Sequence, residues 1–374
     1  MYKKYYSHFL NANPNILHFA AHSHHYWPDV TLEAQKQYWF DSANFVDDKW
    51  EKILGEKKEH CTQLIAKIIE VSHPEQIVFA PNTLELIFRL LTTLDWTKKI
   101  KILTTPNEFH SFRRLSQRLK ELPQFEIVTE EISHFEKRIQ QEKFDVIFFS
   151  RVLFNSGIVV KNWEELIEKI PDNTIISMDD YHGFMAVPIS LSKIQNKIFY
   201  LAGGYKYAQG GEGACFMYIP KGKNLRPFYT GWFADFAHLE DEQKTIEYAN
   251  DGMGFAGATM DFTAMYRLLS VLELFEKEKI TIEQIHQYIQ NLQKDFLENS
   301  SLKNFIGDTS LQYQGHFLTY QFSSVQETKN YVQQLRSHNI IVDARGERLR
   351  FGFGMYHDNN DVKLLIEKLQ KIKM

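Results

Sequence analysis

Several features are scarce in this chain of 374 residues, and each absence removes a class of protein. Its two cysteines, Cys61 and Cys215, are too few and too far apart for a disulfide framework or a zinc knuckle, so a reducing compartment is expected. No apolar run approaches the roughly 18 residues of a membrane span, and the N-terminus lacks the apolar core of a signal peptide. The net charge is only −4, without a long basic run, which gives nucleic-acid binding little support. We therefore expect a cytoplasmic protein with neither membrane nor nucleic acid as a partner.

The length and composition predict a globular protein with a large and a smaller domain. Hydrophobic residues make up 44% and charged residues 24%, as in globular chains, and the length exceeds one typical core. Short β-branched or aromatic runs alternate with helical patterns through the first part, which predicts an α/β fold with a mostly parallel sheet and helices on both faces. The expected strands there cover 77–80, 100–104, 144–150, 174–178, 198–202 and 214–219, and the expected helices 84–94, 111–119 and 163–170.

From about Asp261 the pattern changes to that of a small α+β domain. Long helices are expected over 262–279 and 281–299, followed by strands over 317–322 and 348–353 and helices over 328–338 and 360–371. We predict a large domain over 61–260, a small C-terminal domain over 261–374, and an N-terminal segment, 1–60, that packs with the small domain.

Lys206 and Asp179 are the first candidates for chemistry, because both follow predicted strands, where α/β proteins bind ligands. Lys206 lies in GGYKYAQGGEG; burial lowers a lysine pKa and makes the amine usable as a nucleophile or Schiff-base partner. A loop lysine between glycine turns is the plain alternative. Asp179, about 25 to 30 residues earlier, suits the protonated ring nitrogen of pyridoxal phosphate (PLP). Its alternative is an ordinary turn or helix cap. Together the two residues favour PLP.

Further candidates fit an anionic, aromatic ligand. Asn82, Thr83 and Leu84 lie between a strand and a helix, whose N-terminus attracts a phosphate, although such residues also serve as plain caps. Phe109 follows another strand and can stack on a flat heterocycle. Arg350 can hold a substrate carboxylate through two hydrogen bonds, or make a salt bridge at a strand edge.

The segment from His22 to His25 contains three histidines, but neighbouring side chains point in different directions, so we expect no metal site. A loop that faces the substrate, with His22 as a candidate contact, or a solvated loop, fits better.

These motifs together resemble the fold-type I PLP-dependent transferases of the class V aminotransferase group, and most of all kynureninases and their relatives, over nearly the whole chain. GYKYAQGGEG resembles the lysine motif, which implies that Lys206 carries the cofactor as a Schiff base and that Tyr205 contacts its phosphate. DDYH resembles an Asp-x-x-His motif, which implies that Asp179 lies at the pyridine nitrogen and His182 beside the ring.

The other motifs follow in the family's order. PNTLELIF implies phosphate contacts at Thr83 and Leu84, and NEFHSF implies that Phe109 stacks on the ring. TGWF implies that Trp232 lies near the phosphate, and FAGATMDF that Thr259 reaches the phosphate of a partner subunit, so a homodimer with shared sites is expected. RFGFGMYHDNNDV implies that Arg350 binds the substrate carboxylate. The segment FAAHSHHYWP departs from the Asn-Ser-Leu-Gly loop that kynureninases tend to have, which leaves the substrate open.

The resemblance implies a kynureninase-like hydrolase or lyase that cleaves an amino acid at its β-carbon. Transamination stays open, because Lys206 serves either route. Cysteine desulfuration is disfavoured, since it needs a mobile thiol and Cys215 lies in an apolar strand run. A non-catalytic PLP fold is disfavoured because Lys206 and Asp179 are both present.

Overall fold

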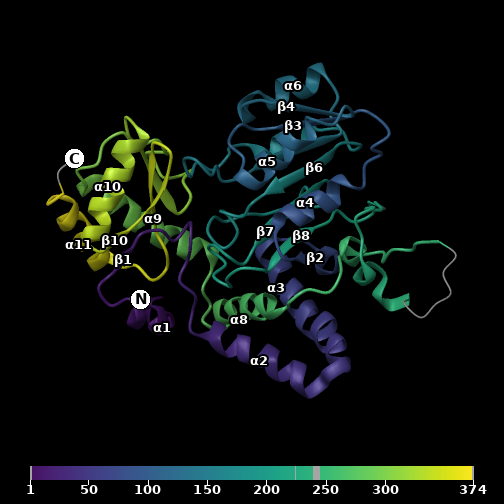
Figure 1. The fold of residues 1–374 in the computed structure, drawn as a ribbon, viewed down its shortest axis with the longest axis horizontal. Coiled ribbons are helices and arrows are strands. Elements are labelled where there is room, and N and C mark those ends of the chain that lie inside the picture. The colour runs from purple at the N-terminus through teal and green to yellow at the C-terminus, as the bar shows by residue number, and fades with distance from the viewer. Residues whose placement is uncertain (1, 224, 239–244, 373–374) are drawn as a thin grey trace.

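The structure is a computed structural model that describes residues 2–223, 225–238 and 245–372. Its centre is a seven-stranded sheet of order β2-β8-β7-β6-β5-β3-β4 (Figure 1). The strands β7, β6, β5, β3 and β4 run parallel, whereas β8 is antiparallel to both of its neighbours. The sheet is therefore mostly parallel, as expected. Its strands are β2 (Ile77–Ala80), β3 (Ile100–Thr104), β4 (Phe125–Thr129), β5 (Val146–Ser150), β6 (Ile175–Asp179), β7 (Ile198–Gly203) and β8 (Cys215–Tyr218).

The central strands are largely apolar because both faces of the sheet are covered. Every residue of β5 and β7 is buried. The helix α4 packs on β2, β7 and β8, and α5 contacts β4. Five helices belong to this part of the chain: α3 (Lys58–Ile69), α4 (Thr83–Leu91), α5 (His110–Leu119), α6 (Phe135–Gln141) and α7 (Trp163–Lys169).

A smaller antiparallel sheet of order β11-β12-β9 lies to one side of the central sheet in Figure 1. Its strands are β9 (Phe317–Gln321), β11 (Asp343–Arg345) and β12 (Arg348–Gly352), and its helices are α9 (Ile282–Asn299), α10 (Val325–Ser337) and α11 (Asn359–Leu369). Both capping-box helices of the described chain, α9 and α11, are here, with Thr281 and Asp358 as the N-caps.

The N-terminal segment reaches this smaller part. After α1 (Ser7–Ala12), strand β1 (Leu17–His18) pairs in parallel with β10 (Ile340–Ile341). The long helix α2 (Val30–Phe45) then packs along α8 (Thr263–Lys277), beneath the central sheet in Figure 1. Short 3-10 turns cover Tyr2–Tyr5, Val46–Asp48, Pro74–Gln76, Ile132–His134, Trp232–His238 and Gly252–Phe255, and a π-helical stretch, Glu51–Lys57, runs into α3.

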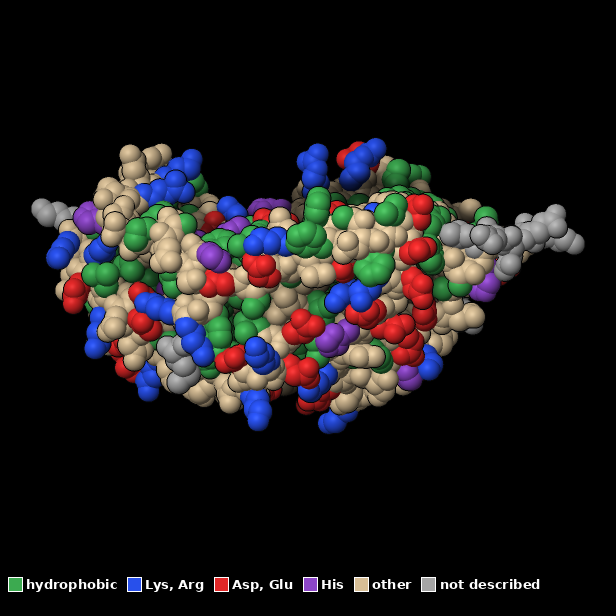
Figure 2. Space-filling model, turned by 90° about the horizontal axis from the view of Figure 1, so that it is seen from below, with side chains coloured by type: hydrophobic (Ala, Val, Ile, Leu, Met, Phe, Trp, Pro, Cys, Tyr) green, Lys and Arg blue, Asp and Glu red, His purple; other side chains and the backbone are tan. Residues whose placement is uncertain are grey.

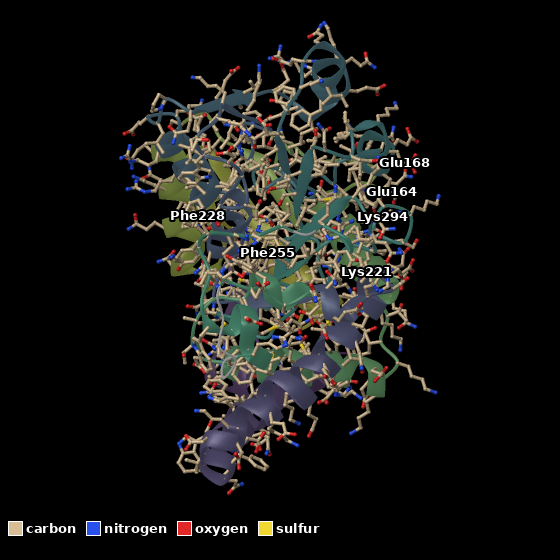
Figure 3. All side chains as sticks on the ribbon, turned by 90° about the vertical axis from the view of Figure 1, so that its right-hand side faces the viewer. Glu164, Glu168, Lys221, Phe228, Phe255 and Lys294 are labelled. Carbon is tan, nitrogen blue, oxygen red and sulfur yellow. The ribbon has the colours of Figure 1, made fainter. Side chains whose placement is uncertain are left out.

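The interior is aromatic and the surface carries both charge signs. Phe255 is 3% exposed, whereas Phe228 is 59% exposed; Figure 3 labels Phe255 near the centre of the view, Phe228 on one side of the molecule and Glu164 on the opposite side. Acidic and basic side chains are interspersed on the face drawn in Figure 2. Among the described residues, no helix has the length and apolar character to cross a membrane.

Candidate active site

A cavity of about 440 Å³ opens where the parallel strands end. The ends of β2, β5, β6 and β7 and the start of β8 meet there, because β8 runs opposite to its neighbours. Most of the residues predicted from the sequence line it together: Asn82, Thr83, Leu84, Phe109, Asp179, His182, Tyr205 and Lys206. The remaining lining residues are Pro81, Ser111, Ser150, Val152, Phe154, Tyr181, Glu212, Gly213 and Cys215.

Lys206 reaches the cavity from the loop that follows β7. Its Nζ contacts Nε2 of His182 and lies 5.4 Å from the ring centroids of Phe109 and of Tyr181. Burial lowers the pKa of Lys206 to about 7; the charge of Arg350 lowers it too, and Asp179 opposes them. A large fraction of this amine is therefore neutral near pH 7, as a nucleophile or proton acceptor requires.

Asp179 ends β6 and faces the same cavity. The backbone N–H of Tyr181 donates to its Oδ1 at 2.9 Å, and burial raises the pKa of Asp179 to about 6. Its neighbour Asp180 points away from the cavity and pairs with Arg151 through contacts of 2.8 and 2.9 Å, while the Tyr200 hydroxyl donates to it at 2.8 Å. Asp180 thus anchors the turn after β6, and Asp179 remains available to a ligand.

The N-terminus of α4 forms another wall. Asn82 is the N-cap, and its side chain accepts a hydrogen bond from the backbone N–H of Glu85 at 2.9 Å. Thr83 and Leu84 follow as the first helical residues and line the cavity. Backbone N–H groups in a first helical turn have no partner within the helix, and the helix dipole favours an anion there. This wall suits a phosphate.

Glu108, which was not assigned to the site, holds the opposite wall. Its carboxyl accepts hydrogen bonds from the Thr105 hydroxyl at 2.6 Å, the Ser150 backbone at 3.1 Å and the Ser150 hydroxyl at 2.5 Å. These contacts tie the loop after β3 to the end of β5. The next residue, Phe109, is 40% exposed and faces the cavity from this loop. An acidic residue at the end of a buried strand was the only signal in the sequence.

Two pairs of predicted residues do not line the cavity. The Trp232 indole N–H donates to the Thr259 hydroxyl at 3.1 Å, apart from the lining residues. Arg350 and His22 are buried behind the cavity, where both contact Asp343. The other histidines of that segment diverge: His24 Nδ1 lies 3.2 Å from the Tyr205 hydroxyl, and His25 Nδ1 lies 2.6 Å from the Tyr26 carbonyl.

The fold and this donor set define a fold-type I PLP-dependent enzyme. An amine, a buried carboxylate, an aromatic side chain and a helix N-terminus meet in one cavity, which fits an aldehyde, a pyridine ring and a phosphate. Residues 20–365 match the class V aminotransferase family, so the chain belongs to that family. The match confirms both the expected fold class and PLP as the expected cofactor.

Solved structures with the same fold include a cystine C–S lyase and cysteine desulfurases. A mutant of C-DES with glycine covalently linked to PLP has a TM-score of 0.82 at 18% identity, covering 98% of this chain and 99% of that chain. The cystine C–S lyase C-DES with its product cysteine persulfide gives 0.81 at 17%, covering 96% and 98%. The cysteine desulfurase of Thermococcus onnurineus NA1 gives 0.80 at 18%, covering 96% and 94%. No curated protein matches the sequence. At these identities the likeness shows the fold, and the kynureninase-like subtype is not confirmed.

Proposed function

We propose that this chain is a PLP-dependent enzyme that acts on an amino acid and cleaves a bond at its β-carbon, in the manner of a kynureninase or a related lyase. The observation that carries the proposal is the buried amine of Lys206, with a pKa lowered to about 7, in one cavity with the carboxylate of Asp179. When bound, PLP supplies an electron sink for the bond broken at the substrate α-carbon.

In this proposal each wall holds one part of the cofactor. Lys206 would bind the aldehyde carbon, and Asp179 would accept a hydrogen bond from the protonated ring nitrogen. Phe109 would lie against the ring. The amides of Thr83 and Leu84, with the Tyr205 hydroxyl, hold the phosphate, and the cap of Asn82 keeps that turn in place.

Lys206 and His182 then handle the proton. Once the substrate amine has taken the place of Lys206 on the cofactor, the freed Nζ would accept the proton from the substrate α-carbon, which its lowered pKa favours near neutral pH. His182 Nε2 contacts this amine, so the imidazole can take up or return the proton. The rings of Phe109, Phe154 and Tyr181 narrow the cavity with apolar surface that suits an aromatic or sulfur-containing side chain.

The two cysteines argue against desulfuration through a protein thiol. Cys215 is 2% exposed and fixed in β8 between β2 and β7, donates to the Tyr181 hydroxyl at 3.4 Å, and has its pKa raised by burial to about 12. Cys61 is buried in α3, and burial raises its thiol pKa as well. Neither thiol is a ready nucleophile. The C–S lyase among the similar structures has cysteine persulfide as its reaction product.

We further propose a homodimer with shared sites. Trp232 and Thr259 bond to each other and do not line the cavity of their own chain, which supports a role for Thr259 in the site of a second copy.

Product analysis tests the reaction. The purified holoprotein is incubated with L-kynurenine, with L-cystine, or with either one plus 2-oxoglutarate. We expect cleavage products, which are anthranilate and alanine from kynurenine, or pyruvate, ammonia and cysteine persulfide from cystine, and their loss in Lys206→Ala. The matched control is Lys221→Ala, an exposed lysine beyond the same sheet (Figure 3). Formation of glutamate from 2-oxoglutarate without cleavage would overturn the proposal in favour of an aminotransferase.

A further inference from the structure

The guanidinium of Arg350 already holds a carboxylate of its own chain. Arg350 on β12 lies directly opposite Asp343 on β11 in the antiparallel pairing, so their side chains share one face of the small sheet. The Nη2 of Arg350 pairs with Oδ2 of Asp343, and its Nη1 donates to the Phe154 carbonyl at 2.8 Å. The two terminal nitrogens of the fork are thus both engaged within the chain.

This pair lies one layer behind the cavity. The guanidinium carbon of Arg350 is 4.5 Å from the ring centroid of Phe154, which lines the cavity, and 5.7 Å from that of Phe317. Arg350 is only 2% exposed. Its charge nevertheless contributes to the low pKa of Lys206, second only to burial. The charge of the arginine therefore acts on the site, while both of its terminal nitrogens are bonded to groups outside the cavity and its Nε is buried without a partner.

Asp343 has other contacts, but Arg350 is its principal partner. His22 Nε2 lies 3.5 Å from Oδ2, and burial lowers the pKa of His22 to about 3, so His22 is neutral and brings no charge. Arg345 Nη1 lies 3.4 Å from Oδ1, but that side chain is half-exposed, and solvent screens its charge. The buried charge of Arg350 is balanced mainly by Asp343.

We propose that Asp343 is a specificity-determining residue, an internal carboxylate that competes with the carboxylate of a substrate for Arg350. A ligand that bears a carboxylate must displace Asp343 before it can pair with Nη2 of the arginine, so the net gain from its charge is small. The site then discriminates between ligands mainly by their remaining groups, which contact Phe109, Phe154 and Tyr181. This inference rests on the proposed function, in which the cavity takes an amino acid.

The test uses a probe that binds without reacting. The acid 3-benzoylpropionate carries an aromatic ketone and a carboxylate but no amine, and 3-benzoylpropionamide is its neutral twin. Calorimetry of the wild-type holoprotein should give the acid and the amide dissociation constants within about threefold of each other. In Asp343→Asn, which keeps an oxygen acceptor but loses the charge, the acid should bind about tenfold tighter or more, since a freed charge-assisted hydrogen bond is available. The amide should not change.

Two further variants distinguish the release of Arg350 from a general loss of packing around the small sheet. Arg345→Gln removes the other arginine at Asp343 and should leave both affinities unchanged. If Asp343→Asn does not fold, Asp343→Ser replaces it, and we expect this variant to bind the acid more tightly than the amide as well. Formate should also raise the melting temperature of Asp343→Ser more than chloride does at equal ionic strength.

The wild-type protein alone can overturn the proposal, if it already binds the acid tenfold or more tightly than the amide. An equal gain for acid and amide in Asp343→Asn would also overturn it. Neither binding result requires PLP to be attached covalently. If PLP proves not to be bound to Lys206, the proposed function is contradicted, but the binding measurements still decide the role of Asp343.

Discussion

The amine of Lys206 contacts the imidazole of His182, although the two side chains come from loops that follow different strands, β7 and β6. The strand register explains the meeting: Asp179 at the end of β6 pairs with Leu201 near the end of β7, so both loops leave the sheet at the same edge. Two nitrogen bases therefore share the cavity floor, and a proton taken up by one can be held by the other.

The pH dependence of cofactor loading follows from Lys206. Its pKa is lowered to about 7, so the reactive neutral amine rises about tenfold between pH 6 and pH 8 and then levels off. We expect the rate at which apoprotein gains visible absorbance from PLP to follow this curve. Nα-acetyllysine is the reference, since its rate should keep rising up to its ordinary pKa. A protein rate that climbs without a plateau through pH 9 would contradict the low pKa.

Glu108 makes the apoprotein less stable at higher pH. Burial raises its pKa to about 7 from the ordinary 4.5, so the folded chain holds this proton more tightly than the unfolded chain. The stabilisation is full below pH 4.5 and is lost as the pH rises through 7, a change on the order of 3 kcal/mol. In Glu108→Gln the urea midpoint should fall less between pH 5.5 and pH 8 than in the wild type.

Asp179 adds a contribution of the same sign at lower pH, because its pKa is raised to about 6, so some pH dependence should remain in Glu108→Gln. Glu126→Gln, at an exposed glutamate of β4, is the matched control and should leave the wild-type slope unchanged. An unaltered slope in Glu108→Gln would show that this carboxyl does not titrate in that range.

A shared site predicts complementation between two defective subunits. Thr259→Val alone should weaken PLP binding about tenfold, the effect of one hydrogen bond to a charged group, and Lys206→Ala alone should abolish the covalent link. Mixed dimers of the two variants contain one site with both native residues, so a fraction of tight, covalent binding should return. Mixing that restores nothing, in a protein that is dimeric by size-exclusion chromatography, would remove Thr259 from the partner's site.

The sequence located the central strands well because buried parallel strands are short, continuous apolar runs. The strand expected over 100–104 is β3, Ile100–Thr104, and that over 77–80 is β2. Strand β4, Phe125–Thr129, was not expected because it is the edge strand, and Glu126 and Thr129 interrupt its apolar run. The helix α2 was not expected either; only Thr31 and Asp41 are fully buried along it, so it lacks a clear apolar stripe.

The candidate site was predictable where residues directly follow strands, as with Asp179, Thr83 and Lys206. Contacts that form only when the loops fold could not be predicted from the sequence. Phe154 faces the cavity because the backbone N–H groups of Leu153 and Val160 pair across a turn with Ile158 and Arg151, a pairing without a pattern in the sequence. The partner of Arg350 was likewise hidden, since Asp343 meets it only through the register of β11 and β12.

Covalent attachment at Lys206 is the claim on which the other roles depend. The most direct measurement is reduction of the PLP-loaded protein with borohydride, followed by proteolysis and mass spectrometry of the peptides. The account predicts one added pyridoxyl phosphate group per chain, on the peptide that contains Lys206, and none in Lys206→Ala. A label on another lysine, or an unlabelled Lys206 peptide in protein that has bound PLP, would contradict it.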